Sequence, residues 1–402
     1  MTLTLLLDLD DTLLDSNMDE FIPVYFQALG KAMGDFVSPE KMLKHLMIGT
    51  NEMIAHDSPD ETLELLFNRN FYPKLGVERS LLDPAIAHFY DEIFPTLAYL
   101  TKWRPEAVDL VEWAFAQGYR VAISTNPLFP QKAIYHRLRW ANLPPEKFHF
   151  EVISSFEGFH FSKPNPAYLA EVLGRMGWPD GPILVVGDDL NNDMRAAQGL
   201  GLPMFWITDD DVSLPEGVDS IAGRGSIGDL RPWLESVDQK TLFPRYQTQS
   251  GIAATMKSTP AVLKEILAPL PQKEWKFSPF KDEWSIVEIV SHMRDVEREV
   301  NLPRIEAFLS EENPFITAGD TDVWAAERCY AQQDGNAVLS DFLAARMETL
   351  SVLMTLKGKD WLRSGRHAIF GPITLEEQLG FIAEHDRVHL IQINEIIKRD
   401  DK

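Results

Sequence analysis

The fold predicted for this chain depends on the stretch Leu5-Leu6-Leu7-Asp8-Leu9-Asp10-Asp11-Thr12. An apolar run of strand length ends in two carboxylates spaced two residues apart, and the chain then turns. In a doubly wound α/β sheet, ligands bind in the crevice beyond the carboxyl ends of the strands. A strand that carries Asp8 and Asp10 to that edge therefore directs acidic groups at a candidate site. For this pair alone, an ordinary surface turn is the alternative.

Short apolar runs alternate with helical patterns over the first part of the chain. The runs are 3–9, 119–124, 150–154, 183–186 and 204–207, and the helical patterns include 105–117, 130–141, 166–176 and 194–199. Strands that alternate with helices predict βαβ units and an α/β fold with a Rossmann-like parallel sheet. The interval 16–100 contains helical patterns and no clear strand, which predicts an inserted all-helical cap.

The pattern changes after residue 236. The segment 239–250 is polar, contains Pro244 and is interpreted as a linker. Four helical patterns and no convincing strand follow, at 252–267, 285–311, 337–356 and 375–399. Four amphipathic helices predict an all-α, up-down four-helix bundle. The expected domains are therefore 1–238, with the cap at about 16–100, and 251–402.

The composition limits the classes of partner. A formal net charge of −23 argues against nucleic acid, because phosphate contacts require clustered Lys and Arg. It also argues against an anionic membrane surface, and no apolar stretch is long enough to span a bilayer. The single cysteine, Cys329, fits a reducing cytoplasm and is predicted to be a packed thiol. We expect a cytoplasmic protein with a small-molecule substrate.

Polar groups also occur at three further points of the sequence, where a strand ends or a helix begins. Ser124-Thr125-Asn126 ends one strand, Lys163 precedes a helix, and Gly187-Asp188 with Asp193 ends another strand. Hard carboxylate oxygens are ligands that Mg²⁺ prefers, with substrate phosphate completing its coordination. Hydroxyl, amide and ammonium groups bind phosphoryl oxygens, so Thr125, Asn126 and Lys163 are the candidate phosphate-binding residues.

Carboxylates crowded at one edge repel each other. Two of them about 4 Å apart repel by roughly 4 kcal/mol at an effective dielectric constant of about 20. A site shared by Asp8, Asp10, Asp188 and Asp193 therefore requires a cation as well as the lysine. Mg²⁺ is the expected cofactor.

These four elements, in this order, resemble the haloacid dehalogenase superfamily over about residues 1–235. Asp8-Leu9-Asp10-Asp11-Thr12 matches its first motif, Thr125-Asn126 its second, Lys163 its third, and Gly187-Asp188 with Asp193 its fourth. The helical interval after the first motif resembles the helical cap of that family. The four matched motifs favour an enzymatic site at this sheet edge over an ordinary surface turn.

The resemblance also implies roles for the residues. Asp8 is the implied nucleophile, forming an aspartyl-phosphate, and Asp10 is the implied acid and then base. Mg²⁺ is held by Asp8, the carbonyl of Asp10 and Asp188, while Asp193 orients the metal's waters or Lys163. The expected catalytic residues are thus Asp8, Asp10, Thr125 and Lys163. Family members that displace halide lack the second aspartate, so Asp10 favours hydrolysis of a small phosphomonoester.

A second candidate site lies in the C-terminal part. His385 and His389 are one helical turn apart and project from one face. His292 on another helix completes a three-nitrogen site suited to a transition metal such as Zn²⁺ or Ni²⁺. Such a metal is expected to leave below the ordinary imidazole pKa of about 6.5. Asp295 and Asp386 either orient an imidazole or lie on a solvated helix face.

Residues 250–402 resemble the DinB-like family of four-helix bundles. The run from Trp284 to Glu297, with its Trp-Ser-x2-Glu-x3-His spacing, and the His385-Asp-x2-His389 run carry the resemblance. It implies His292, His385 and His389 as ligands of a divalent metal and a possible homodimer through the bundle. Two alternatives therefore stand beside the phosphatase. The bundle carries the main activity as a metal-dependent thiol transferase or hydrolase, or it serves only for dimerisation or metal sensing.

Overall fold

The computed structural model describes residues 2–208, 214, 221–278 and 283–400. The chain divides into two compact units, one formed by Met1–Val172 and Pro179–Tyr246 and the other by Leu173–Trp178 and Gln247–Lys402. Each unit is described by itself. Of the described helices, none combines the length and apolarity needed to cross a membrane.

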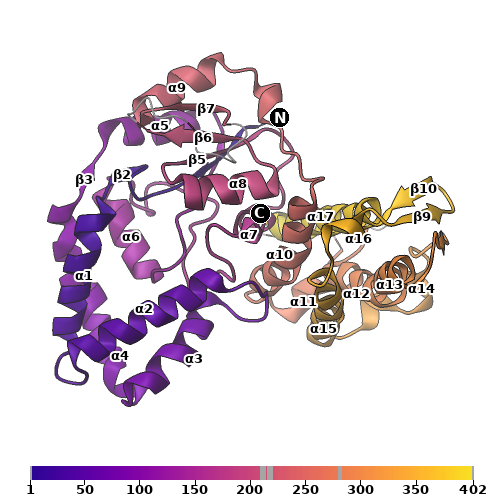
Figure 1. The fold of residues 1–402 in the computed structure, drawn as a ribbon, viewed down its shortest axis with the longest axis horizontal. Helices are drawn as coiled ribbons and strands as arrows, with labels where there is room; N and C mark the ends of the chain where they lie inside the picture. Colours follow the sequence, from indigo (N-terminus) through magenta and orange to yellow (C-terminus); the bar gives the residue numbers. More distant parts are fainter. Residues whose placement is uncertain (1, 209–213, 215–220, 279–282, 401–402) are drawn as a thin grey trace. The chain divides into compact units, whose positions relative to one another are not determined.

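A five-stranded parallel sheet forms the centre of the N-terminal unit (Figure 1). Its strand order is β4-β1-β5-β6-β7, with bounds Arg120–Ile123, Thr4–Leu7, Ile183–Gly187, Met204–Ile207 and Gly223–Gly225. Strand β1 pairs with β4 on one side and with β5 on the other. All four of its residues are buried, as expected for a central parallel strand covered on both faces. The predicted α/β fold with a parallel sheet is confirmed.

Two strand predictions were wrong in detail. The run 150–154 is not a strand, although it makes an isolated bridge between Ile153 and Ile123 and backbone hydrogen bonds with the edge strand β4. Strand β7 was missed because its sequence, Gly223-Arg224-Gly225, contains no apolar residue to give a strand pattern. It pairs in parallel with β6 through backbone groups alone.

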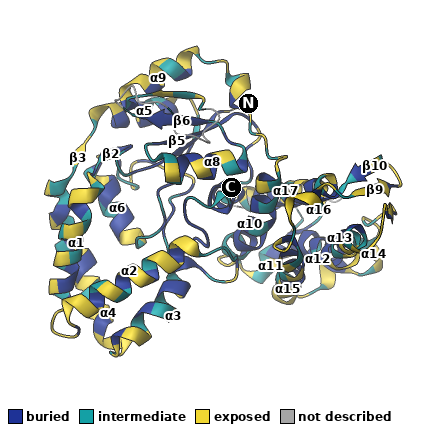
Figure 2. Ribbon diagram, viewed as in Figure 1, coloured by how far each residue is buried: buried dark blue, intermediate teal, exposed yellow. Residues whose placement is uncertain are grey.

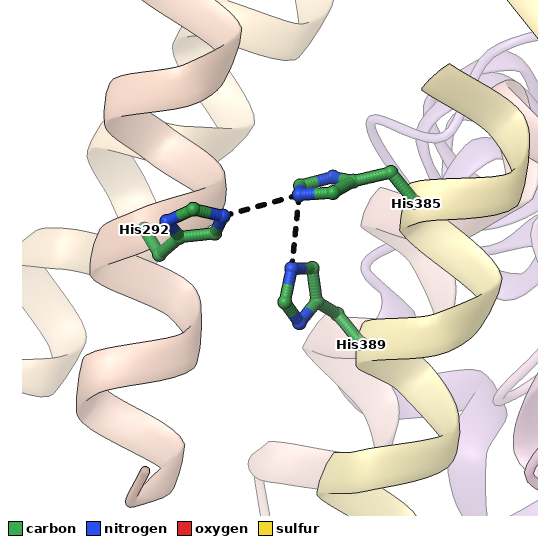
Figure 3. A group of neighbouring side chains, drawn as sticks. All are labelled: His292, His385 and His389. Atoms are coloured by element: carbon green, nitrogen blue, oxygen red, sulfur yellow. Dashed lines mark hydrogen bonds between the residues drawn. The ribbon is translucent and has the colours of Figure 1, made fainter. Parts of the chain in front are cut away.

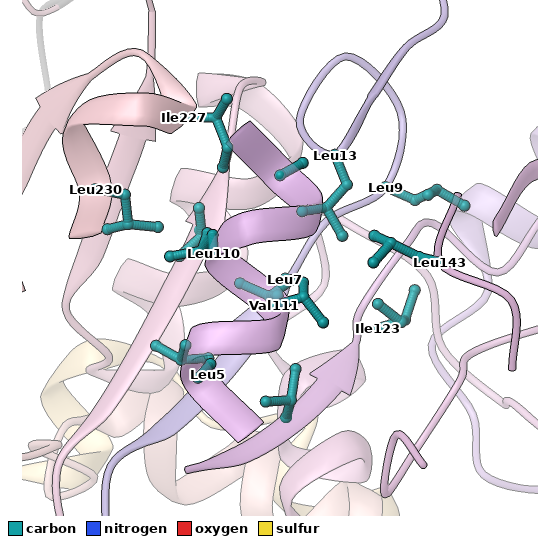
Figure 4. Close-up of a cluster of buried hydrophobic side chains, with 14 of the residues drawn as sticks. Leu5, Leu7, Leu9, Leu13, Leu110, Val111, Ile123, Leu143, Ile227 and Leu230 are labelled. Carbon is teal, nitrogen blue, oxygen red and sulfur yellow. The ribbon is translucent and has the colours of Figure 1, made fainter. Parts of the chain in front are cut away.

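The core of this unit forms where helices cover the sheet. The helices are α5 Pro105–Ala116, α6 Gln131–Trp140, α7 Pro166–Arg175, α8 Arg195–Leu200 and α9 Ile227–Ser236. Helix α7 belongs to this unit only as far as Val172. Leu110 and Val111 of α5 meet Leu5 and Leu7 of β1 in this core (Figure 4). Because Leu5 and Leu7 are fully buried, the carboxyl end of β1 is held firmly where Asp8 follows.

The cap follows the first strand. Its helices are α1 Met18–Ala32, α2 Pro39–Ala55, α3 Leu63–Leu75 and α4 Arg79–His88, followed by a π-helix at Phe89–Ile93 and a 3-10 helix at Phe94–Leu100. The buried residues of α2 recur every three or four positions, so one side of the helix is buried (Figure 2). Two short strands, β2 Leu14–Asp15 and β3 Lys102–Trp103, pair at the two ends of this insertion. The sequence pattern did not reveal them.

The C-terminal unit is built on four long helical segments. They are α10 Gln249–Leu267; α12 Ile286–Val296, which continues through a π-helix at Glu297–Asn301 into α13 Leu302–Ser310; α15 Gly335–Leu353; and α17 Leu375–Asp400. Helix α12 packs against α15 and α17, and α10 packs against the same two helices. The four helices therefore enclose one core, and the predicted four-helix bundle is confirmed. The predicted up-down order was wrong, because the consecutive long helices α10 and α12 pack mainly against α15 and α17 and not against each other. The predicted linker 239–250 begins with a 3-10 helix, Gln239–Leu242, and α10 starts before it ends.

The bundle also contains structure that was not predicted. A three-stranded sheet is formed by β8 Phe315–Ile316, β9 Ser364–His367 and β10 Gly371–Thr374. The expectation of no strand was wrong because these strands are only two to four residues long, and β9 and β10 have too few apolar residues to give a strand pattern. Short helices occur at α11 Gln272–Trp275, α14 Trp324–Glu327, the 3-10 helix Tyr330–Gln332 and α16 Gly358–Trp361. Cys329 is exposed, so its prediction as a packed thiol was also wrong.

Candidate active site and candidate metal centre

The loop after β1 holds the two aspartates of the first motif. Asp11 adopts a left-handed backbone conformation with φ of 53°, and its Oδ1 accepts hydrogen bonds from the backbone N–H groups of Ser16 and Asn17. These bonds close the turn that directs the chain into the cap. Asp8 is buried at the strand end, whereas Asp10 is partly exposed.

Lys163 connects the first and fourth motifs. Its Nζ lies 2.6 Å from Asp8 Oδ1 and 2.5 Å from Asp193 Oδ1. Its backbone N–H donates to Asn126 Oδ1 at 3.2 Å, which ties the second motif to the third. Burial alone would lower the pKa of Lys163, but the carboxylates of Asp193 and Asp8 outweigh burial and raise it well above its usual value. The lysine therefore stays an ammonium ion.

A group of carboxylates surrounds this lysine. Oxygen atoms of Asp8, Asp188 and Asp193 all lie within 4.8 Å of one another. Burial, together with the charge of Asp8, raises the pKa of Asp188 to about 8. Burial raises the pKa of Asp193 to about 7, although Lys163 opposes the shift. One ammonium ion thus leaves the site deficient in positive charge, and a hard divalent cation such as Mg²⁺ fits this oxygen donor set.

Gly187 makes the position of Asp193 possible. A Cβ atom at residue 187 would lie 2.3 Å from Asp193 Oδ2, closer than atoms can approach. The turn after β5 is closed by Asp189, whose Oδ1 accepts from the N–H groups of Asn191 and Asn192. Asp193 Oδ2 accepts in turn from the N–H of Asp189 at 3.1 Å. The spacing of the fourth motif therefore returns Asp193 to the strand end.

Asp10 lies in a different environment from the other acids. Its carboxylate accepts from Ser16 Oγ at 2.9 Å and forms an ion pair with the guanidinium of Arg137. Arg137 is buried on α6 and stacks over the ring of Phe129. Burial lowers the pKa of Arg137 to about 10, so it is still charged at neutral pH. The Asp10 carboxylate is not part of the Asp8–Asp188–Asp193 group.

Arg137 was missed by the sequence reasoning, although a signal was present. Ala133 and Ile134 lie one helical turn before Arg137, and Leu138 directly follows it. All three are buried. A cation on the apolar face of an amphipathic helix predicts a buried ionic partner. The predicted partner would have been an acid at the neighbouring strand ends.

A cavity of about 380 Å³ opens above these residues. Its polar side is lined by all the residues predicted for the first site, namely Asp8, Asp10, Thr125, Asn126, Lys163, Asp188 and Asp193. The opposite side comes from cap helices α1 and α2 and includes Ile22, Phe26 and Leu46. Thr125 is buried, and its carbonyl accepts hydrogen bonds from Ser154 and Tyr168 at 2.7 Å each. The structure thus brings all seven predicted residues together around one cavity.

The second candidate site lies inside the bundle. His292 projects from α12, and His385 and His389 project from α17, toward one point (Figure 3). His385 Nε2 lies 3.1 Å from His292 Nε2 and 3.0 Å from His389 Nε2. Three convergent ring nitrogens are a donor set for a borderline transition metal.

The surroundings keep these imidazoles neutral. Burial lowers the pKa of His292 to about 4 and that of His385 well below its ordinary value, and burial also lowers the pKa of His389. His389 Nδ1 lies 2.8 Å from Gln392 Oε1, so its Nδ1–H can donate there and leave Nε2 free as a ligand. Protons therefore compete with a metal for these ring nitrogens only at a pH lower than the value of about 6.5 that the ordinary imidazole pKa predicts.

The two nearby aspartates do not contact the histidine rings. Asp386 is buried and pairs with Arg346, which also binds Glu297 at 2.8 Å. Asp295 accepts from Tyr330 at 2.7 Å and pairs with arginines 294 and 328. Both predicted alternatives, an imidazole partner and a solvated face, were therefore wrong. Asp386 links α17 to α15 through Arg346, and Asp295 ties α12 to the segment that contains Arg328 and Tyr330.

A cavity of about 410 Å³ reaches the histidine group. His389, Trp284 and Gln392 line it, together with acidic residues that include Asp322 and Glu395. The Trp284 ring lies against the ring of His292, with centroids 4.8 Å apart. A molecule in this cavity could approach a metal held by the three histidines from one side.

Two family models match the chain. Residues 2–201 match haloacid dehalogenase-like hydrolases. Residues 255–393 match the DinB superfamily. Both resemblances suggested by the motifs are confirmed, and the chain is a hydrolase with a DinB-type bundle.

Individual relatives match the two parts separately. A phosphoglycolate phosphatase of Aliivibrio fischeri is 28% identical over 207 residues, which is 50% of this chain and 82% of the relative. The Oceanobacillus iheyensis protein named "Putative metal-dependent hydrolase OB0782" is 26% identical over 36% of this chain and 84% of its own length. A solved phosphatase from Thermococcus onnurineus is 19% identical, covering 58% of this chain and 98% of its own, with a TM-score of 0.38.

Proposed function

Because residues 2–201 belong to the haloacid dehalogenase-like hydrolases, we propose that this chain is a Mg²⁺-dependent phosphatase that hydrolyses a small phosphomonoester through an aspartyl-phosphate. One observation carries the proposal. Lys163 Nζ lies between the carboxylates of Asp8 and Asp193 at the floor of a cap-covered cavity. The relative named phosphoglycolate phosphatase supports the same reaction class.

Asp8 is the nucleophile in this proposal. Its carboxylate attacks phosphorus, the bond from phosphorus to the ester oxygen breaks, and the phosphoryl group is transferred to Asp8. Lys163 fixes the Asp8 carboxylate, because its Nζ holds Oδ1 at 2.6 Å and leaves the second oxygen to react. Thr125 and Asn126 line the same cavity and offer donors to the phosphoryl oxygens.

Asp10 supplies and then removes a proton. In its protonated form it donates to the departing ester oxygen, and as a carboxylate it then accepts a proton from the water that attacks the aspartyl-phosphate. Ser16 and Arg137 hold this carboxylate away from the metal-binding acids. The cap residues Ile22, Phe26 and Leu46 exclude bulk water, which strengthens electrostatic interactions within the cavity.

Asp8, Asp188 and Asp193 have the donor chemistry for Mg²⁺. When bound, the cation would neutralise part of the charge that develops on the transferring phosphoryl group. The predicted assignment gave Asp8, the Asp10 carbonyl and Asp188 as ligands, and Asp193 as the residue that orients either the metal's waters or Lys163. The ion pair of Asp193 with Lys163 supports the latter role.

The experiment is a phosphate-release screen of the full chain against a panel of phosphomonoesters. The screen is run with Mg²⁺ and again after chelation, with Mg²⁺ restored in a third arm. We expect release that disappears on chelation and returns with Mg²⁺. Equal release in all three arms would contradict the metal requirement, and no release from any ester would contradict the phosphatase assignment.

A second candidate activity belongs to the bundle. The cavity of about 410 Å³ that reaches His389 favours metal-assisted hydrolysis or thiol transfer over a purely structural metal. The relative whose name includes "metal-dependent hydrolase" supports this candidate. The test is whether loading the chain with Zn²⁺ or Ni²⁺ produces ester hydrolysis or thiol transfer that is lost in His389→Ala. Occupancy without either activity would favour metal sensing or dimerisation.

The composition supports a proposal for the cellular setting and the partners of the protein. A single cysteine fits a reducing cytoplasm, and the charge of −23 disfavours nucleic acid and anionic membranes as partners. We also propose a homodimer through the bundle, for which sedimentation of the full chain should give twice the mass of one chain.

A further inference from the structure

The cap side of the active-site cavity is apolar. The cap contributes Met18, Ile22, Tyr25, Phe26, Leu46 and Thr50, and the segment after β4 adds Leu128 and Phe129. Of these eight residues, six have hydrocarbon or thioether side chains. A leaving group bound beyond the phosphate therefore meets an apolar wall.

The two polar groups of this wall already have partners. Tyr25 Oη lies 2.9 Å from Tyr90 Oη, and Thr50 Oγ1 donates to the Leu46 carbonyl at 2.9 Å. Burial raises the pKa of Tyr25 to about 12, so it stays neutral. Neither group adds charge to the cavity.

The charges in this cavity are strongly unbalanced. Within the described part of the chain, its lining holds six aspartates and one cationic side chain, Lys163. That lysine is already bound by Asp8 and Asp193. A metal and Lys163 can together serve the phosphate, but a second anionic group on the substrate would have no counter-charge. Acidic neighbours and an apolar wall would both disfavour it.

A second cavity, of about 260 Å³, lies beside the first within the cap. It shares Tyr25, Leu46, Thr50 and Leu128 with the first cavity. Its other buried lining residues are apolar or aromatic and include Leu29, Met33, Met53, Phe67 and Phe71.

The charged residues of the second cavity are paired with other protein groups, and Glu64 accepts a hydrogen bond from Asn68 at 3.3 Å. Arg79 is exposed and pairs with Asp83 at 3.3 Å, and Lys132 is exposed and pairs with Asp91 at 2.6 Å. Glu157 accepts from the backbone N–H of Gln131 at 2.9 Å. Exposed, paired charges mark the solvent end of this space, so its interior remains apolar.

We propose that the substrate is a phosphomonoester whose leaving group is uncharged and apolar, and that this group extends from the phosphate through the first cavity into the second. This inference rests on the proposed phosphatase activity and adds the class of leaving group. It excludes esters whose leaving group carries a carboxylate or a second phosphate as preferred substrates.

The first test is a series of straight-chain alkyl phosphates from methyl to octyl, with phosphoglycolate as the anionic comparison. Burial of one CH₂ group contributes ~0.8 kcal/mol, so kcat/KM is expected to rise about fourfold per added methylene until the cavities are filled. Phosphoglycolate is expected to be a poorer substrate than propyl phosphate. A flat series, or a preference for phosphoglycolate, would overturn the inference while leaving the phosphatase assignment intact. No turnover of methyl, octyl or nitrophenyl phosphate would instead contradict the proposed function itself.

The second test changes the size of the inner cavity. Met33 lines only the second cavity and is buried. Met33→Trp should lower the ratio of kcat/KM for octyl over butyl phosphate by tenfold or more, an order-of-magnitude expectation equal to about two lost methylene groups. Met33→Ala should move the chain-length optimum upward. The matched control is Leu65→Trp, at an exposed cap position, which should leave the ratio unchanged. Equal ratios in all four proteins would show that the chain does not enter this cavity.

The third test changes the charge of the first cavity. Phe26→Arg adds a cation to the apolar wall, and Phe36→Arg adds the same cation at an exposed position outside either cavity lining. The ratio of kcat/KM for phosphoglycolate over propyl phosphate should rise in the first variant and stay unchanged in the second. An equal change in both would mean that net charge, and not the cavity wall, determines the preference.

Discussion

Replacing Lys163 with methionine should strongly destabilise the N-terminal unit in the absence of metal. The ammonium is 2% exposed and contacts two carboxylates that are themselves buried. Removing one partner of a buried ion pair typically costs ~3–5 kcal/mol, because a buried charge is left unpaired. With two carboxylates left behind, we expect Lys163→Met to lose at least about 3 kcal/mol of unfolding free energy at pH 8.

The sign of the pH dependence follows from the carboxylate pKa values. Burial already raises the pKa of Asp193 to about 7, and loss of the lysine raises it further. Raised folded-state values mean that the folded protein binds more protons than the unfolded chain, so stability falls as pH rises. The deficit of Lys163→Met should therefore shrink between pH 8 and pH 5.

The assay is native-state hydrogen exchange of the β1 and β5 amides in EDTA, which follows this unit separately from the bundle. The matched control is Lys147→Met, since Lys147 pairs with Glu112 at 2.7 Å on the surface. An exposed pair contributes ~0–1 kcal/mol. If Lys163→Met exchanged like Lys147→Met at pH 8, the lysine would not be neutralising buried carboxylates, and the electrostatic reasoning would be refuted.

The remaining predictions concern chemistry and metals. Asp10→Asn should slow turnover of alkyl phosphates by ~10²–10⁴-fold and hurt nitrophenyl phosphate least, because nitrophenolate needs little protonation; equal losses would contradict the acid role. Ion chromatography should detect no chloride released from a 2-chloroalkanoate, and release at enzymatic rates would contradict the phosphatase assignment. Because burial raises the pKa of Asp188 to about 8, Mg²⁺ affinity measured by calorimetry should rise from pH 6 to pH 8 with proton release; a pH-independent affinity would argue against Asp188 as a ligand. His292→Ala should lower the Zn²⁺ or Ni²⁺ occupancy that elemental analysis measures. Because burial lowers the pKa of His292 to about 4, the wild-type protein should keep its metal at pH 6 and lose it near pH 4. Full occupancy in the variant would leave the histidines as packing residues.

The sequence predicted those parts of the fold that depend on apolar periodicity. The four-residue strand β1 and the long helix α17 bury regular apolar sets, so both were visible as patterns. Strands β7 and β9 were not visible, because Gly223-Arg224-Gly225 and Ser364–His367 pair through backbone groups with few apolar side chains. Backbone pairing leaves no compositional signal.

The candidate site residues were predictable because their chemistry follows strand ends directly. Asp8 and Asp188 each follow a buried strand, and parallel strands carry such residues to one edge. For Arg137, the apolar helix face predicts a buried acidic partner but does not say which acid, and for Asp386 the sequence does not give the partner at all. Each contact depends on which helix face packs against a neighbour, and that is a property of the tertiary fold.

The two cavities lined by cap residues could not be predicted from the sequence. Tyr25, Leu46 and Leu128 come from three separate segments, and each is an ordinary core residue in its own helix or loop. They bear on substrate choice only because they line a space next to the carboxylates, where the leaving group is proposed to bind. Prediction of that space requires the packing of α1 against α2.

The most direct measurement is phosphate release by Asp8→Asn beside wild type, with Mg²⁺ and the best alkyl phosphate as substrate. The substitution keeps the shape of the side chain but removes the nucleophile, so turnover should be abolished. Hydrogen exchange at β1 should show that the strand is still folded. Undiminished phosphate release by a folded Asp8→Asn protein would contradict covalent catalysis by Asp8.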